Sequence, residues 1–169
     1  SCLRLKYLVF VFALIVGVPA LAALAFGSGR RRGQLLAVIA FSAVLGDSVG
    51  VNFFSTELYR GPDRGFEVTL TDLMCLSLAG VIALKGERSL RWFPAGTAPM
   101  LLLYVCGFVS LKDASSPWLS MFTLFKGLRL YLLYWTVYNA LVTGVDLAWL
   151  RRGLSAAGLW MTFFAVKQK

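Results

Sequence analysis

The chain has 169 residues, of which 59% are hydrophobic, and its mean hydropathy is +0.74. Soluble domains average about 45–50% apolar residues, so a water-soluble fold of this size is not expected. The formal net charge is +9, but the cations are concentrated between apolar runs, as in the basic loops of membrane proteins, and this pattern argues against nucleic-acid binding.

Metal and disulfide chemistry have little material in this sequence. It contains no His and three Cys, at positions 2, 75 and 106, with no pair at zinc-ligand spacing. Two of these cysteines lie inside apolar runs, where Cys usually behaves as a small hydrophobe. We therefore expect neither a metal nor another cofactor.

Six apolar runs are candidates for transmembrane helices, because about 20 apolar residues are needed to cross a bilayer. The first run is too long for the apolar part of a signal peptide, and three arginines follow it. The last run is interrupted by Arg151 and Arg152. We predict an all-α, polytopic transmembrane helix bundle with five to six spans, as one domain over residues 1–169. The runs are approximately 7–26, 34–54, 66–84, 94–111, 117–142 and 147–166.

The basic residues predict an orientation in the membrane. Lys and Arg are concentrated in the first, third and fifth connections, at residues 30–32, 85–91 and 151–152. Cytoplasmic loops are typically basic, so these connections are expected inside, and residues 51–65, 112–116 and the N-terminus outside. The chain also begins without Met and ends directly after an apolar run, so we expect a fragment of a longer multi-pass protein.

Residues 53–72 are charged and aromatic, unlike the rest of the chain, and contain the turn signal Gly-Pro-Asp at 61–63. One interpretation is an ordinary solvated loop with aromatic residues at the membrane interface. The other is a site at the mouth of a cavity, where Arg60 and Arg64 offer guanidinium groups suited to phosphate or carboxylate. The residues alone leave both open.

Ionisable residues inside apolar runs are a sharper signal, because each is costly in lipid and so faces protein or water. Glu67 and Asp72 lie in the third run, and Lys126 and Arg129 share a helix face in the fifth. Counted at about 1.5 Å per residue, Asp72 and Lys126 lie at comparable depths, so an ion pair is geometrically possible. These charges either hold helices together or bind an anionic headgroup.

The fifth run also carries an aromatic stripe, defined by Tyr131, Tyr134, Trp135 and Tyr138, with Asn139 beside it. The spacing places these side chains along one stripe of a helix. Such a stripe is more often used for helix packing than for binding. Aromatic faces also suit sugars and isoprenoid chains, so a lipid-linked glycan is the alternative.

Three segments resemble the N-terminal half of bacterial O-antigen ligase and polymerase-like proteins. They are NFFSTELYRGPDRGFEVTLTD at 52–72, KGLRLYLLY at 126–134 and the closing VKQK at 166–169. The resemblance implies an inverting glycosyltransferase of the bacterial inner membrane that uses no metal and no nucleotide sugar. Its donor would be a glycan on undecaprenyl diphosphate, and its acceptor, lipid A-core or another growing chain, would be used at the periplasmic face.

In that family the catalytic Arg and His residues lie in the C-terminal half, which these residues do not include. We therefore assign no catalytic residue and expect the fragment alone to be inactive. By charge and depth, Arg60, Arg64, Lys126 and Arg129 are the candidates for binding the diphosphate, with Glu67 and Asp72 as buried charge partners. The alternatives are a fragment of a transporter or flippase, although no internal repeat is evident, and a structural membrane subunit.

Overall fold

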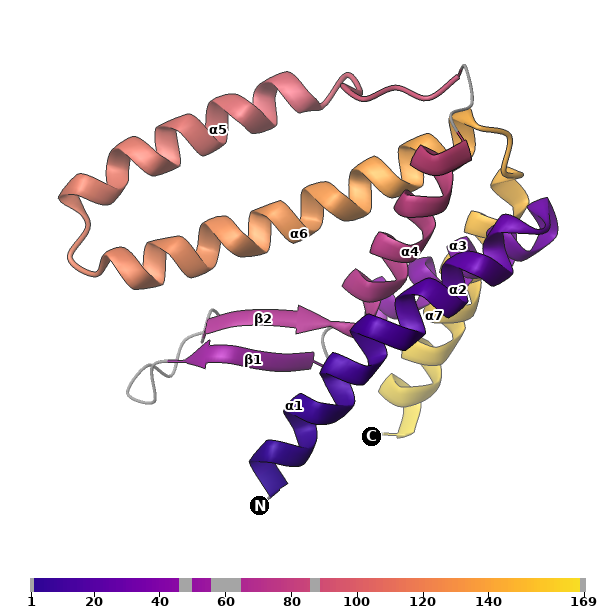
Figure 1. The fold of residues 1–169 in the computed structure, drawn as a ribbon, viewed down its shortest axis with the longest axis horizontal. Helices are drawn as coiled ribbons and strands as arrows, with labels where there is room; N and C mark the ends of the chain where they lie inside the picture. Colours follow the sequence, from indigo (N-terminus) through magenta and orange to yellow (C-terminus); the bar gives the residue numbers. More distant parts are fainter. Residues whose placement is uncertain (1, 46–49, 56–64, 86–88, 168–169) are drawn as a thin grey trace.

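The computed structural model describes residues 2–45, 50–55, 65–85 and 89–167 (Figure 1). The chain begins with helix α1 (Cys2–Phe12), a π-helical turn (Ala13–Gly17) and α2 (Val18–Phe26), which follow one another without a break. Pro19 accounts for the wide turn, because a proline inside a helix lacks an N–H group and clashes with the carbonyl four residues earlier. Residues Tyr7–Phe26 are long and apolar enough to cross a membrane, and most of their side chains are exposed.

The expected bundle of five to six spans is wrong. Among the residues that the structure describes, Tyr7–Phe26 is the one helical segment with the length and composition of a span. Helices α3 (Gly29–Leu45), α4 (Leu70–Lys85) and α5 (Thr97–Ser110) have 17, 16 and 14 residues. At 1.5 Å per residue they reach about 21–26 Å, less than the hydrocarbon thickness of about 30 Å.

The two remaining helices are long enough to cross a membrane, but their composition is too polar for a candidate span. Helix α6 (Pro117–Val142) has 26 residues, but Lys126, Arg129 and several tyrosines lower its mean hydropathy. Helix α7 (Leu147–Lys167) has 21 residues and carries Arg151 and Arg152 in its second turn. Length alone would allow both to cross a bilayer, and their polar residues are what set them apart from Tyr7–Phe26.

The described residues are mostly helical, as the all-α prediction expected, but a β-hairpin that was not predicted lies between α3 and α4. Strand β1 (Gly50–Ser55) pairs antiparallel with β2 (Gly65–Thr69), with Asn52 opposite Glu67 and a register shift between Asn52 and Ser55. The hairpin takes residues from the expected second and third spans, 34–54 and 66–84. Both strands contain the β-branched and aromatic residues that favour extended structure, namely Val51, Phe53, Phe54, Phe66 and Val68.

The core lies where α3, α4, α6 and the start of α7 meet. Its buried side chains are Leu36, Ile39, Met74, Cys75, Leu78, Ile82, Ala140 and Val145. Helices α3 and α7 run parallel and in close contact, and two glycines allow the approach. A Cβ atom added at Gly33 would overlap Trp149, and one added at Gly153 would overlap the backbone of Ala37. Helix α5 lies alongside α6, away from this core (Figure 1).

Candidate functional site

The site begins at the junction of β2 and α4. Thr69 is the last residue of the strand, and its N–H donates to Oδ2 of Asp72 at 2.8 Å. The Asp72 N–H donates in return to Oγ1 of Thr69 at 3.4 Å. This reciprocal arrangement is a capping box, which satisfies backbone donors that the first turn of a helix leaves unpaired. It fixes the Asp72 carboxylate at the start of α4.

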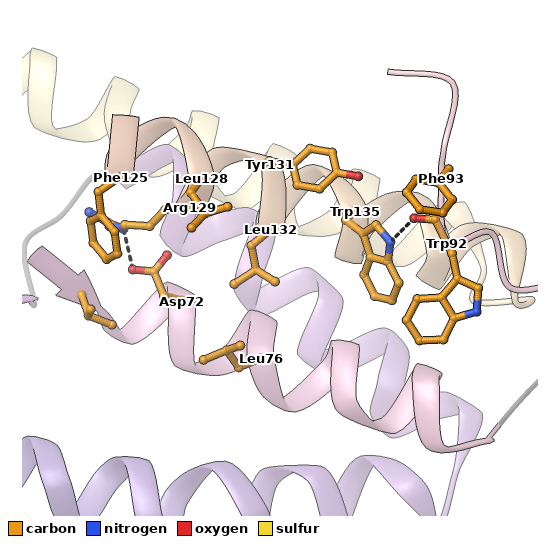
Figure 2. A pocket seen from close by; sticks show the side chains of 11 residues that line it. Asp72, Leu76, Trp92, Phe93, Phe125, Leu128, Arg129, Tyr131, Leu132 and Trp135 are labelled. Atoms are coloured by element: carbon orange, nitrogen blue, oxygen red, sulfur yellow. Dashed lines mark hydrogen bonds and ion pairs between the residues drawn. The ribbon is translucent and has the colours of Figure 1, made fainter. Parts of the chain in front are cut away.

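Arg129, in the middle of α6, completes the cluster. Its Nε lies 2.7 Å from Oδ2 of Asp72 (Figure 2). Its Nη2 donates to Oγ1 of Thr69 at 3.1 Å. The side chains of Arg129 and Asp72 are only 14% and 11% exposed, so this is a largely buried ion pair. Such a pair is costly to desolvate and costly to break by removing one partner.

An apolar pocket of about 790 Å³ extends from this ion pair between α4, α6 and the segment before α5. Figure 2 shows Asp72 and Arg129 at one end and Trp92, Phe93 and Trp135 at the other. The remaining lining residues are Val68, Leu76, Phe125, Leu128, Tyr131 and Leu132. The pocket thus combines a long apolar wall with one charged end and one aromatic end.

A second, smaller pocket of about 160 Å³ is also lined by Asp72 and Arg129. Its other polar lining residues are Thr69, Thr71 and Lys126, and Ala43, Leu130 and Leu133 complete the wall. Lys126 lies one turn before Arg129 on α6 and is exposed. The ion pair therefore belongs to the walls of both pockets, one apolar and one more polar.

The aromatic stripe of α6 holds the segment before α5 in place. The Trp135 indole N–H donates to the carbonyl oxygen of Trp92 at 3.1 Å, and the Gly96 N–H donates to the Tyr134 hydroxyl at 3.2 Å. The hydroxyls of Thr97 and Tyr131 share a hydrogen bond of 2.8 Å. These contacts favour the packing interpretation of the stripe, although Tyr131 and Trp135 also line the larger pocket.

Asn139 fixes the same segment at its other end. The Arg91 N–H donates to Oδ1 of Asn139 at 2.9 Å, and Nδ2 of Asn139 donates to the Arg91 carbonyl at 3.1 Å. The side-chain amide thus pairs with both backbone groups of one residue. Because Asn139 is fully buried, these bonds satisfy polar groups that would otherwise be costly.

The structure brings three of the six predicted site residues together. Asp72 pairs with Arg129, and Lys126 lines the smaller pocket beside them. Glu67 is a half-buried residue of β2, in a strand rather than in the helix expected for it. Two further predicted residues, Arg60 and Arg64, lie outside the described residues.

Thr69 is a site residue that was not predicted, although the sequence carries a signal for it. A Thr followed three residues later by an acidic residue, just before an apolar run, is the pattern of a capping box. The role of Trp92 and Phe93 had no comparable signal, because it depends on how the segment before α5 folds back onto α6. Across the described ranges, no group of three His, Cys, Asp or Glu residues could hold a metal ion.

Comparisons with protein-family models, with curated protein sequences and with solved structures give no match to this chain. The resemblance to O-antigen ligase and polymerase-like proteins therefore stays a prediction from the residues that carry it.

Proposed function

We propose that the chain is part of a membrane-bound glycosyltransferase of the O-antigen ligase and polymerase kind, and that Arg129 and Lys126 bind the diphosphate of its polyprenyl-linked glycan donor. One observation carries the proposal: the buried Arg129 lies in the wall shared by an apolar pocket and a smaller polar one. That arrangement suits an amphiphile with an anionic head and a hydrocarbon chain. The glycan itself is supplied by the resemblance.

The charges favour an anion at this place. Two cationic side chains, Arg129 and Lys126, and one carboxylate, Asp72, lie on the wall of the smaller pocket. Guanidinium and ammonium groups form short, charge-assisted hydrogen bonds with phosphate oxygens, and these are stronger where water is largely excluded.

The apolar surroundings suit the chain of such a donor. The larger pocket ends on the indole rings of Trp92 and Trp135, whose centroids lie 6.1 Å apart. Helix α5 exposes a row of large apolar side chains, Leu101, Leu102, Leu103, Val105, Phe108 and Val109. A soluble monomer rarely exposes so much contiguous apolar surface, so in this proposal α5 contacts lipid or another protein segment. The Tyr7–Phe26 helix would anchor the chain in the bacterial inner membrane.

Catalysis is not assigned to these residues. The proposal gives this chain the binding of the donor, and the general base that deprotonates the acceptor hydroxyl would come from another part of the complete protein. We therefore expect donor binding, but no glycan transfer, from these 169 residues alone.

A structural role is the second candidate, and the capping box favours it. Asp72 forms the capping box with Thr69 at the start of α4, and its ion pair with Arg129 holds α4 against α6. Both charges are therefore explained without any ligand. This interpretation does not explain the apolar pocket beside the ion pair.

Binding of undecaprenyl diphosphate to the purified chain in detergent separates the two candidates, with undecaprenol as the uncharged control ligand. Lys126→Gln and Arg129→Lys should each weaken binding of the diphosphate and leave undecaprenol unaffected. Arg129→Lys tests the fork geometry, because it keeps the charge and loses the planar donors. Lys112→Gln, an exposed cation at the turn before α6, is the matched control. Equal affinity for both ligands in the wild type would leave the ion pair a structural element.

A further inference from the structure

Seven cations gather at one end of the molecule. They come from the start of α3, the end of α4, the segment before α5 and the second turn of α7, and are Arg30, Arg31, Arg32, Lys85, Arg91, Arg151 and Arg152. Figure 1 shows that the ends of α2, α4 and α6 lie together, whereas the β-hairpin and both chain termini lie toward the other end. We call these seven residues the basic end.

Side-chain contacts fix each of these segments against a neighbouring helix. The Lys85 ammonium lies 5.3 Å from the ring centroid of Phe26, and the Arg152 guanidinium lies 4.8 Å from that of Trp149. Trp149 in turn packs against Gly33, one residue after the three arginines of α3. Arg91 is held at its backbone by Asn139. These contacts place Lys85 beside the end of α2 and the arginines of α7 near the start of α3.

Helix stability does not explain the basic end. Three arginines follow directly on Gly29 in the first turn of α3, where the helix dipole disfavours positive charge. Among the described residues, the acid at this end is Asp146, and its carboxylate accepts a hydrogen bond from the Ala148 N–H at 2.9 Å as it caps α7. The described residues of the basic end therefore include more cations than carboxylates.

The basic end lies where the apolar N-terminal helix stops. Phe26 is the last residue of the candidate span, and Lys85 sits directly over its ring. If Tyr7–Phe26 crosses a bilayer, these cations lie at the depth of the lipid headgroups, within a Debye length of about 8–10 Å from the surface.

We propose that the basic end binds the phosphates of anionic phospholipids in the leaflet where the Tyr7–Phe26 helix ends. Lipid is favoured over nucleic acid because the end of the candidate span sets this surface at the bilayer. Arginine is the suited residue, since its fork bonds two phosphate oxygens at once. The proposal shares no residue with the candidate donor site, so either can fail without the other.

The test is binding of phosphatidylglycerol and phosphatidylcholine to the purified chain in neutral detergent. Wild type should prefer phosphatidylglycerol, and 1 M salt should remove the preference. Arg151→Gln and the separate variant Arg31→Gln should each weaken phosphatidylglycerol binding by about fivefold, as expected for one cation near an anionic surface. Both side chains are exposed, so neither change should prevent folding. The control Lys112→Gln should bind as wild type.

Several outcomes would overturn the proposal. Equal binding of the two lipids by wild type would do so, as would unchanged phosphatidylglycerol binding in both arginine variants. Full competition by millimolar inorganic phosphate would indicate a site for a free ion instead of a lipid. Tighter binding of a single-stranded RNA oligonucleotide than of phosphatidylglycerol would assign the surface to nucleic acid.

Discussion

Arg129 reaches across 57 residues of sequence to Asp72, and its Nε lies 2.7 Å from the carboxylate oxygen Oδ2. The same oxygen accepts hydrogen bonds from the N–H and the hydroxyl of Thr69. One carboxylate oxygen therefore joins a strand end, a helix start and the middle of a second helix. Loss of this carboxylate should affect all three elements together.

We predict that Asp72→Ala lowers the free energy of unfolding by about 3 kcal/mol or more, because it removes a largely buried ion pair with Arg129 and a helix cap. Asp113→Ala is the control, since Asp113 is an exposed acid in the first turn of a 3₁₀ helix (Leu111–Asp113). Thermal unfolding in detergent, followed by circular dichroism, measures both. Equal losses in the two variants would show that the ion pair contributes little.

A second prediction concerns the clamp between Asn139 and Arg91. Asn139→Ala should leave both backbone groups of Arg91 without these partners and release the segment before α5. Trypsin should then cut the bond after Arg91 at least several times faster, as measured by mass spectrometry of the early fragments. Thr136→Ala is the matched control, because Thr136 is equally buried on α6 and bonds only to its own helix at Leu132. Equal rates would refute the clamp.

Part of the fold could be predicted because its signals are local. The apolar run 117–142 has the same bounds as α6, with Pro117 in the first turn, where a missing N–H does no harm, and Gly144 just after the end. Gly144 has φ +92°, a conformation that side chains other than glycine rarely adopt. Proline and glycine thus mark both boundaries of this helix.

The hairpin and the number of spans could not be predicted in this way. A short apolar run suits a strand as well as a buried helix, so Val51–Phe54 could be read as the end of a span. Pairing with residues 65–69 decides the matter, and it depends on contacts between distant parts of the chain. The ion pair between Asp72 and Arg129 could not be predicted for the same reason. The expected depth of Asp72 assumed a helix from Phe66, whereas residues 65–69 form a strand and α4 begins at Leu70.

A third prediction tests the close contact between α3 and α7. A Cβ atom at position 153 would overlap the carbonyl oxygen of Ala37, and backbone cannot rotate away as a side chain can. Gly153→Ala should therefore separate the helices and lower the free energy of unfolding by about 1–3 kcal/mol, as overpacking does elsewhere. Gly158→Ala, one turn later with nothing within 4 Å of its Cβ, should be neutral or slightly stabilising. The reverse order of stability would contradict this packing.

The last prediction concerns two cysteines with opposite surroundings. Cys75 is buried in the core and Cys106 is exposed on α5. Burial, and secondarily the Asp72 carboxylate, raises the pKa of the Cys75 thiol from 9.0 to about 12. Because the thiolate is the reactive form, a maleimide at pH 8 should modify Cys106 and spare Cys75 in the folded protein.

The raised pKa of Cys75 also predicts a pH dependence of stability with a definite sign. In the unfolded chain the thiol loses its proton near pH 9, whereas in the folded protein it keeps the proton to about pH 12. The unfolded state therefore binds fewer protons between these values, and the free energy of unfolding falls as pH rises through this window. Cys75→Ala removes this contribution but not those of lysine and tyrosine. Chemical denaturation of both proteins at pH 8 and pH 10.5 should show a larger loss in the wild type, and equal losses would mean that the Cys75 thiol ionises as easily in the folded protein as in the unfolded chain.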